Sequence, residues 1–81
     1  MVGAPNGWHE ERGALEREFR FADFEQALAF VNRVGALAES ENHHPDISIH
    51  WNTVTLRWWT HVENAITDRD VRLAALTNEL L

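Results

Sequence analysis

Two alternating segments joined by a two-residue loop constrain the fold of this chain most. Apolar and polar residues alternate over 46–51 and again over 54–59, and Asn52-Thr53 lies between them. Such alternation is typical of a strand with one buried face, and a two-residue loop fixes the register of a β-hairpin. The sequence therefore predicts a hairpin with a turn at Asn52-Thr53 and one apolar face. That register gives three apolar cross-strand pairs: Trp51 with Val54, Ile49 with Leu56 and Ile47 with Trp58.

A second pair of strands is predicted nearer the N-terminus. Over residues 15–21, Leu15, Phe19 and Phe21 share one side, and charged residues occupy the other. Residues 8–11 precede this segment, and Gly13 lies between the two, where a tight turn favours glycine. We expect the two segments to pair across Gly13.

The sequence between the strand pairs predicts an amphipathic helix from Phe24 to Ser40. Apolar residues recur there at helical spacing, and Asp23 is a suitable N-cap. Gly35, inside the helix, costs ~1 kcal/mol relative to alanine unless another element packs closely against it. The predicted apolar stripe consists of Phe24, Ala27, Leu28, Phe30, Val31, Val34, Leu37 and Ala38.

A second helix is predicted after Thr67. Thr67 is the expected N-cap, and Asp70 stands where a capping box has its acidic residue. The resulting order is strand, strand, helix, strand, strand, helix. This order predicts an α+β fold in which both helices pack on one face of a four-stranded antiparallel sheet.

The size and composition of the chain exclude several classes. Its 81 residues make one small domain, since a domain typically takes ~100–200 residues, and we expect residues 1–7 to be a flexible lead-in to a domain over 8–81. The absence of cysteine excludes disulfides, thiolate metal sites and a cysteine nucleophile. Neither a signal peptide nor an apolar run of ~18 residues is present, and we therefore expect a cytoplasmic protein.

The charge balance argues against two classes of partner. The net charge is −6, from 13 acidic residues and 7 arginines. Nucleic acids and anionic membranes are bound by basic surfaces, so we expect neither partner. Four tryptophans and four phenylalanines in so short a chain favour stabilisation by oligomerisation.

Three of the five histidines gather at the open end of the predicted hairpin. If the predicted pairing continues past Pro45, His44 lies opposite His61, and His43 directly precedes His44 in the chain. Opposed residues hold their Cβ atoms ~5 Å apart. Because imidazole exchanges a proton near neutral pH, this cluster suits general acid–base catalysis.

Alternative roles for these residues remain open. Glu39 and Asp70 can orient histidines, as an aspartate does in a catalytic triad, but Asp70 also suits a capping role alone. The histidines also suit an exposed loop, or a Zn²⁺ or Fe²⁺ site, although adjacent histidines rarely both reach one ion. Alternation places Trp58 in the core and Trp59 on the opposite face, as a pocket wall or a subunit contact.

The spacing of these residues resembles that of the pterin-4a-carbinolamine dehydratase family. The family pattern is an acidic residue, His-His-Pro, an aromatic residue, a histidine and an aspartate. Thr60-His61 and 67–70, followed by Leu73-Ala74, also resemble family segments, and the resemblance extends over residues 8–81. The residues that fit the pattern are Glu39, His43, His44, Pro45, Trp51, His61 and Asp70.

The resemblance implies an enzyme that eliminates water from 4a-hydroxytetrahydropterin to give quinonoid dihydropterin. This reaction regenerates the tetrahydropterin used by aromatic amino-acid hydroxylases, and family members need no metal or organic cofactor. The resemblance implies that His43 and His61 are the catalytic acid–base pair. It implies that the other motif residues bind the pterin substrate or support its pocket: Glu39, His44, Pro45, Trp51 and Asp70.

The resemblance also implies a homodimer or homotetramer and leaves a second function open. The family fold also serves as a non-catalytic module that binds transcription factors or assists assembly. The chain departs from the family pattern at three places: residues 62–66 lack the usual glycines, Ile47 replaces an aromatic residue, and we expect the N-terminal helix of the family to be absent. These departures bear on the shape of the pocket and on assembly.

Overall fold

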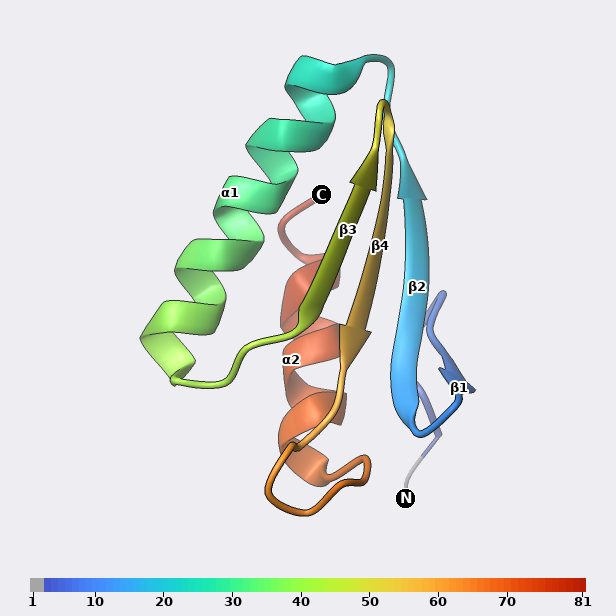
Figure 1. Cartoon of the computed structure of the whole chain (residues 1–81), viewed down its shortest axis with the longest axis vertical. Coiled ribbons are helices and arrows are strands. Elements are labelled where there is room, and N and C mark those ends of the chain that lie inside the picture. Colours follow the sequence, from blue (N-terminus) through green and yellow to red (C-terminus); the bar gives the residue numbers. More distant parts are fainter. Residues whose placement is uncertain (1–2) are drawn as a thin grey trace.

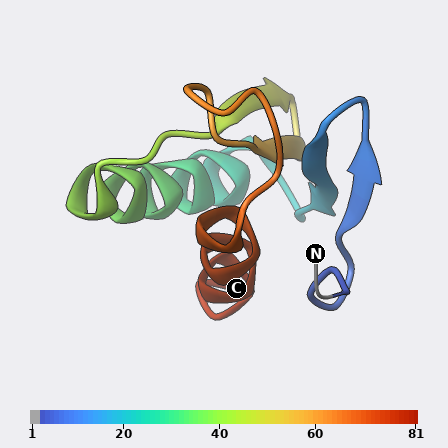
Figure 2. The same cartoon turned by 90° about the horizontal axis from the view of Figure 1, so that it is seen from below.

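Four antiparallel strands form one sheet in the order β1-β2-β4-β3 in the computed structural model, which describes residues 3–81 (Figure 1). Both helices lie on one side of this sheet (Figure 2). The predicted α+β fold is confirmed, and the described residues before β1 contain no helix. The elements are β1 (His9–Glu11), β2 (Ala14–Arg20), α1 (Phe24–Glu41), β3 (Asp46–His50), β4 (Thr53–Trp58) and α2 (Asp68–Asn78).

The segment before β1 is attached to the end of α2. The predicted lead-in, residues 1–7, begins outside the described residues. In its described part, the carbonyl oxygen of Asn6 accepts hydrogen bonds from Arg17 Nη1 at 3.2 Å and from Asn78 Nδ2 at 2.9 Å. Next to it, Trp8 Nε1 donates to Asn78 Oδ1 at 2.8 Å. These bonds join the segment before β1 to β2 and to the end of the last helix.

The core lies between the sheet and the two helices. In α1, Ala27, Phe30 and Val34 are buried as the predicted stripe requires. Phe24 and Leu28 are 47% and 41% exposed, so this end of the predicted stripe is not part of the core. Neither helix in the described part of the chain is long and apolar enough to cross a membrane. The other buried apolar residues are Trp8, Ala14, Leu15, Phe19, Ala38, Val54, Leu56, Trp58, Leu73 and Ala74.

The hairpin of β3 and β4 turns one residue earlier than predicted. Ile49 pairs with Val54 instead of Leu56, because the turn is formed by Trp51-Asn52 and not by Asn52-Thr53. Asn52 is fixed by the preceding chain: its side-chain Nδ2 donates to the carbonyl of Phe21, and its own carbonyl accepts from the Phe21 N–H, both at 2.8 Å. The predicted register is therefore wrong by two residues.

The correction keeps the faces of the strands and changes their partners. A shift by two residues leaves each side chain on its original face, so Trp58 is buried with 0% exposure, as predicted. Ile47, expected on the apolar face, is 40% exposed at the edge of the sheet. The strand pairing ends at Asp46 and Arg57, so the predicted pairing of histidines directly across the hairpin does not form.

We expect Gly35→Ala to stabilise the chain. No atom outside its own helix backbone lies within 4 Å of the position that a Cβ would take there, and an interior helical glycine costs about 0.8–1 kcal/mol relative to alanine. The free energy of unfolding should rise by about 0.5–1 kcal/mol, measured by urea denaturation. A lower midpoint would contradict this prediction.

Candidate functional site

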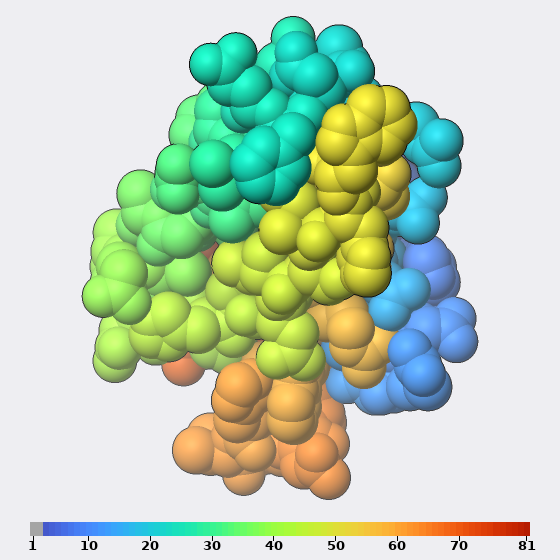
Figure 3. Space-filling view, turned by 45° about the horizontal axis from the view of Figure 1, so that its top comes forward, coloured from blue at the N-terminus to red at the C-terminus, as the bar shows by residue number. Residues whose placement is uncertain are grey.

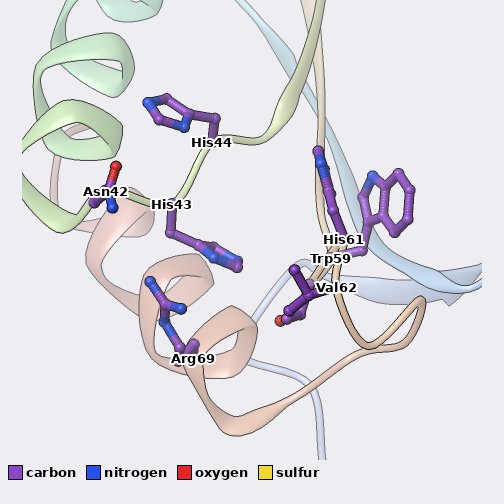
Figure 4. A pocket seen from close by; sticks show the side chains of 8 residues that line it. Asn42, His43, His44, Trp59, His61, Val62 and Arg69 are labelled. Atoms are coloured by element: carbon purple, nitrogen blue, oxygen red, sulfur yellow. The ribbon is translucent and has the colours of Figure 1, made fainter.

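A cavity of about 200 Å³ opens where β4 ends and β3 begins. Its walls come from the α1–β3 connection, the segment after β4 and the first turn of α2 (Figure 4). In the space-filling view the orange segment that follows β4 projects beyond the rest of the molecule (Figure 3). The structure thus brings the three predicted histidines to one cavity. The lining residues are Asn42, His43, His44, Trp59, Thr60, His61, Val62 and Arg69.

The end of α1 directs two consecutive histidines to different environments. Asn42 adopts the left-handed conformation (φ 51°, ψ 43°), and its N–H caps the carbonyls of Ala38 and Glu39. The N–H of His43 also donates to the carbonyl of Ala38, at 3.1 Å. The chain therefore leaves the helix sharply, with His43 buried and His44 exposed.

His43 is held by a buried carboxylate. Its Nε2 lies 2.7 Å from Oδ1 of Asp70, whose side chain is 0% exposed. Oδ2 of Asp70 accepts hydrogen bonds from the N–H of Thr67 at 2.9 Å and from Oγ1 of Thr60 at 2.8 Å. The predicted capping box is confirmed, and the same carboxylate orients His43 with its other oxygen.

This contact determines which ring nitrogen of His43 faces the cavity. A carboxylate only accepts hydrogen bonds, so Nε2 is the nitrogen that donates to Asp70. Among the described residues, Nδ1 has no hydrogen-bond partner, and no fully buried side-chain nitrogen or oxygen lacks one. Nδ1 is therefore accessible from the cavity that His43 lines, and in the neutral ring it carries the lone pair.

One face of the His43 ring packs on the core. Its imidazole is stacked on the indole of Trp58, with ring centroids 5.8 Å apart and an interplanar angle of 9°. Trp58 Nε1 in turn donates to Oγ1 of Thr77 in α2, at 3.1 Å. His43 is thus fixed both in the plane of its ring, by Asp70, and perpendicular to it, by Trp58.

The other two histidines are exposed at the mouth of the cavity. His61 follows β4, and its ring centroid lies 4.1 Å from that of Trp59. His44 Nε2 donates to the carboxylate of Glu39, five residues before it in the chain, and both side chains are more than half exposed. Unlike His43, these two rings have a free path to solvent.

The remaining motif residues occupy other positions. Trp51 lies in the β3–β4 turn, at the opposite end of the hairpin from the cavity, and is 69% exposed (Figure 1). Glu39 contacts His44 but does not line the cavity, and Pro45 leads from the histidines into β3. Asp70 lies behind His43.

Sequence reasoning did not assign four lining residues to the site: Asn42, Thr60, Val62 and Arg69. Asn42 has a signal in the sequence, because asparagine is among the residues that end helices in the left-handed conformation. Arg69 has a weaker signal in the sequence: it lies within the predicted capping box, between Thr67 and Asp70. Val62 is 92% exposed, and nothing in its local sequence indicates a site.

An ion pair joins the two helices beside the cavity. Arg72 Nη1 donates to Oε1 of Glu41 at 2.6 Å, and this hydrogen bond lowers the pKa of the Glu41 carboxyl and raises the pKa of Arg72. Arg69 Nη2 donates to the carbonyl of Glu41 at 3.3 Å. The bonds link the end of α1, just before the histidines, to the start of α2, which carries Asp70.

The geometry of the histidines does not form a metal-binding set. Within residues 3–81, no three His, Cys, Asp or Glu side chains are placed to share one ion. His43 has one ring nitrogen directed to Asp70, and His44 has one directed to Glu39. The arrangement offers one buried ring held by Asp70 and two exposed rings that line the same cavity.

Comparisons with known proteins agree on one family. The family model described as "Pterin 4 alpha carbinolamine dehydratase" matches residues 2–80. Two curated proteins named "Putative pterin-4-alpha-carbinolamine dehydratase" are 51% identical over 67 residues, from Syntrophotalea carbinolica, and 40% identical over 79 residues, from Koribacter versatilis. The matches cover 83% and 98% of this chain, and 60% and 84% of the relatives.

Two solved structures share the fold. A crystal structure of a transcriptional coactivator/pterin dehydratase from Brucella melitensis is 34% identical, with a TM-score of 0.87, and the match covers 93% of this chain and 82% of that one. A pterin dehydratase-like protein identified as a RuBisCO assembly factor of the alpha-carboxysome is 22% identical, with a TM-score of 0.74, and the match covers 90% and 84% of the two chains. The second likeness bears on the fold alone.

Proposed function

Because the chain belongs to the pterin 4 alpha carbinolamine dehydratase family, we propose that it eliminates water from 4a-hydroxytetrahydropterin to give quinonoid dihydropterin. One observation carries the proposal: the buried carboxylate of Asp70 holds His43 at a cavity that His61 also lines. Two histidines that line the same cavity can act as general base and general acid in such an elimination.

The reaction assigns a role to each histidine. The bond between C4a and the hydroxyl oxygen breaks, a ring N–H of the pterin loses its proton, and water leaves. His43 is the base, because Asp70 accepts its Nε2–H and leaves Nδ1 free to take the proton. His61 is the acid that protonates the departing hydroxyl. One proton is taken up and one is given, so the pair returns to its starting state by exchange with solvent.

The rim of the cavity binds the rest of the substrate in this proposal. The volume of about 200 Å³ is below the ~300–1,000 Å³ of pockets that enclose a ligand, so the cavity takes the reacting part of the pterin and leaves its remainder at the mouth. His44, with Glu39 beside it, and Arg69 supply donors and acceptors there.

The proposal is tested by following dehydration of 4a-hydroxytetrahydropterin, generated in situ, by absorbance. We expect acceleration over the uncatalysed reaction, unchanged after the protein has been treated with EDTA and dialysed. Activity lost on chelation and restored by Zn²⁺ or Fe²⁺ would replace acid–base catalysis with the metal-dependent alternative. No acceleration by the untreated protein would remove the dehydratase proposal.

A second candidate is a binding module of the same fold. The Brucella relative is described as a transcriptional coactivator as well as a pterin dehydratase. Exposed apolar residues outside the cavity favour a contact surface in this chain too, among them Trp51 and Phe24, at 69% and 47% exposure. Binding of a partner protein by a chain that does not accelerate dehydration would support this candidate.

A further inference from the structure

We propose that Trp59 is a positioning residue for His61 and that Asp46 holds Trp59 in place. The inference deepens the proposed function, on which its catalytic consequence rests. It assigns a task to two residues outside the seven-residue motif.

The contact between the two rings follows from extended backbone. In an extended chain, residues two apart project to the same side, which places Trp59 and His61 next to each other after β4. Their ring centroids are 4.1 Å apart at an interplanar angle of 36°. Figure 4 shows the indole on the side of His61 that is turned away from His43. The indole thus limits rotation of the His61 ring away from the cavity.

His61 needs such support because it is exposed. An exposed side chain exchanges between rotamers within nanoseconds, and a general acid acts only while it is within hydrogen-bond reach of the departing group. His43 has Asp70 and Trp58 to fix its ring. The indole of Trp59 is the corresponding support on the His61 side.

Trp59 is itself anchored to the strand that follows the other two histidines. Its Nε1 donates to Oδ2 of Asp46 at 3.0 Å. Nε of Arg57 lies 4.0 Å from the same oxygen, and Nη1 of Arg57 donates to Oε1 of Glu16 at 2.8 Å. Asp46 directly follows His43-His44-Pro45, so the bond joins the two segments that supply the histidines of the cavity.

NMR spectra of the histidine ring protons test the contact without any substrate. Stacking on the indole shifts the His61 resonances upfield, and these are identified by their loss in His61→Gln. We expect the shift to disappear in Trp59→Leu and to persist in Trp51→Leu, which removes an indole from the other end of the same hairpin. Asp46→Ala should reduce the shift, whereas Asp46→Asn, which keeps an acceptor oxygen, should retain most of it.

Steady-state kinetics test the consequence for catalysis. A misplacement of a catalytic group by about 1 Å costs on the order of 10²-fold in rate, so we expect Trp59→Leu to lower kcat by about 10–100-fold and to change KM little. Trp59→Phe, which keeps an aromatic face, should recover most of the activity. A raised KM with wild-type kcat would overturn the proposal, because Trp59 would then be only a wall that binds substrate.

The two readouts separate this inference from the proposed function. If wild-type protein does not dehydrate the pterin, the proposed function fails, and the NMR spectra alone decide whether Trp59 and Asp46 hold His61. His61 resonances that stay at their wild-type position in Trp59→Leu overturn the positioning role whatever the activity. If Trp59→Leu does not fold, Asp46→Ala provides the same test, because it removes the hydrogen-bond acceptor of the Trp59 indole and leaves the indole itself in place.

Discussion

Replacement of His61 by alanine is expected to reduce the rate of pterin dehydration by about 10²–10⁴-fold while the fold is retained. The ring is exposed and outside the core, so its removal leaves no cavity. In the proposed reaction it supplies the proton to the departing hydroxyl, and the other two histidines that line the cavity come from the α1–β3 connection and not from the segment after β4. Absorbance assays measure the rate, and urea denaturation measures the stability of the same sample.

A matched control separates the site from a general effect of losing a histidine. His50 is an exposed histidine at the turn end of β3, away from the cavity, and His50→Ala should keep wild-type activity. The double variant His43→Ala/His61→Ala should be little slower than either single variant, because groups that act as a unit give non-additive losses. Substantial activity in His61→Ala would refute its role as the acid.

The gathering of the three histidines at one end of the hairpin could be predicted from the sequence, but the strand register from which it was predicted was wrong. Alternation defines the faces of β3 and β4, and it does not distinguish a turn at Trp51-Asn52 from one at Asn52-Thr53. The choice is made by the hydrogen bonds of Asn52 to Phe21, 31 residues earlier. A tertiary contact of that kind has no local sequence signal.

Asp70 has both of the roles that the sequence offered as alternatives, helix capping and orientation of a histidine. Its spacing after Thr67 predicts a helix cap, and its place in the motif predicts an orienting carboxylate. The side chain has two oxygens, of which Oδ2 caps the helix and Oδ1 holds His43. The bond of Trp59 to Asp46 forms by another route than the predicted register, which places these two residues opposite each other: in the structure Asp46 pairs with Arg57, and the indole reaches it diagonally from beyond the end of β4.

Trp58→Ala is expected to lower the free energy of unfolding by ~3–5 kcal/mol, the usual cost of deleting a large buried aromatic side chain. Trp58 is fully buried, and its Nε1 donates to Oγ1 of Thr77. The loss is a large fraction of the free energy of unfolding of an ordinary domain, which is ~5–15 kcal/mol. Urea denaturation measures it. Trp51→Ala, at a 69% exposed position of the same hairpin, should change stability by no more than ~0.5 kcal/mol.

Trp58→Phe links this stability to the site if the alanine variant does not fold. Phenylalanine fills most of the volume and keeps an aromatic face beneath His43, whose ring stacks on the indole at 5.8 Å. It removes the donor to Thr77, whose hydroxyl still donates to the carbonyl of Leu73 at 2.6 Å. We therefore expect a smaller loss of stability and a lower kcat, because His43 loses part of the surface that fixes it. A denaturation midpoint close to that of wild type in both variants would show that Trp58 does not support the core.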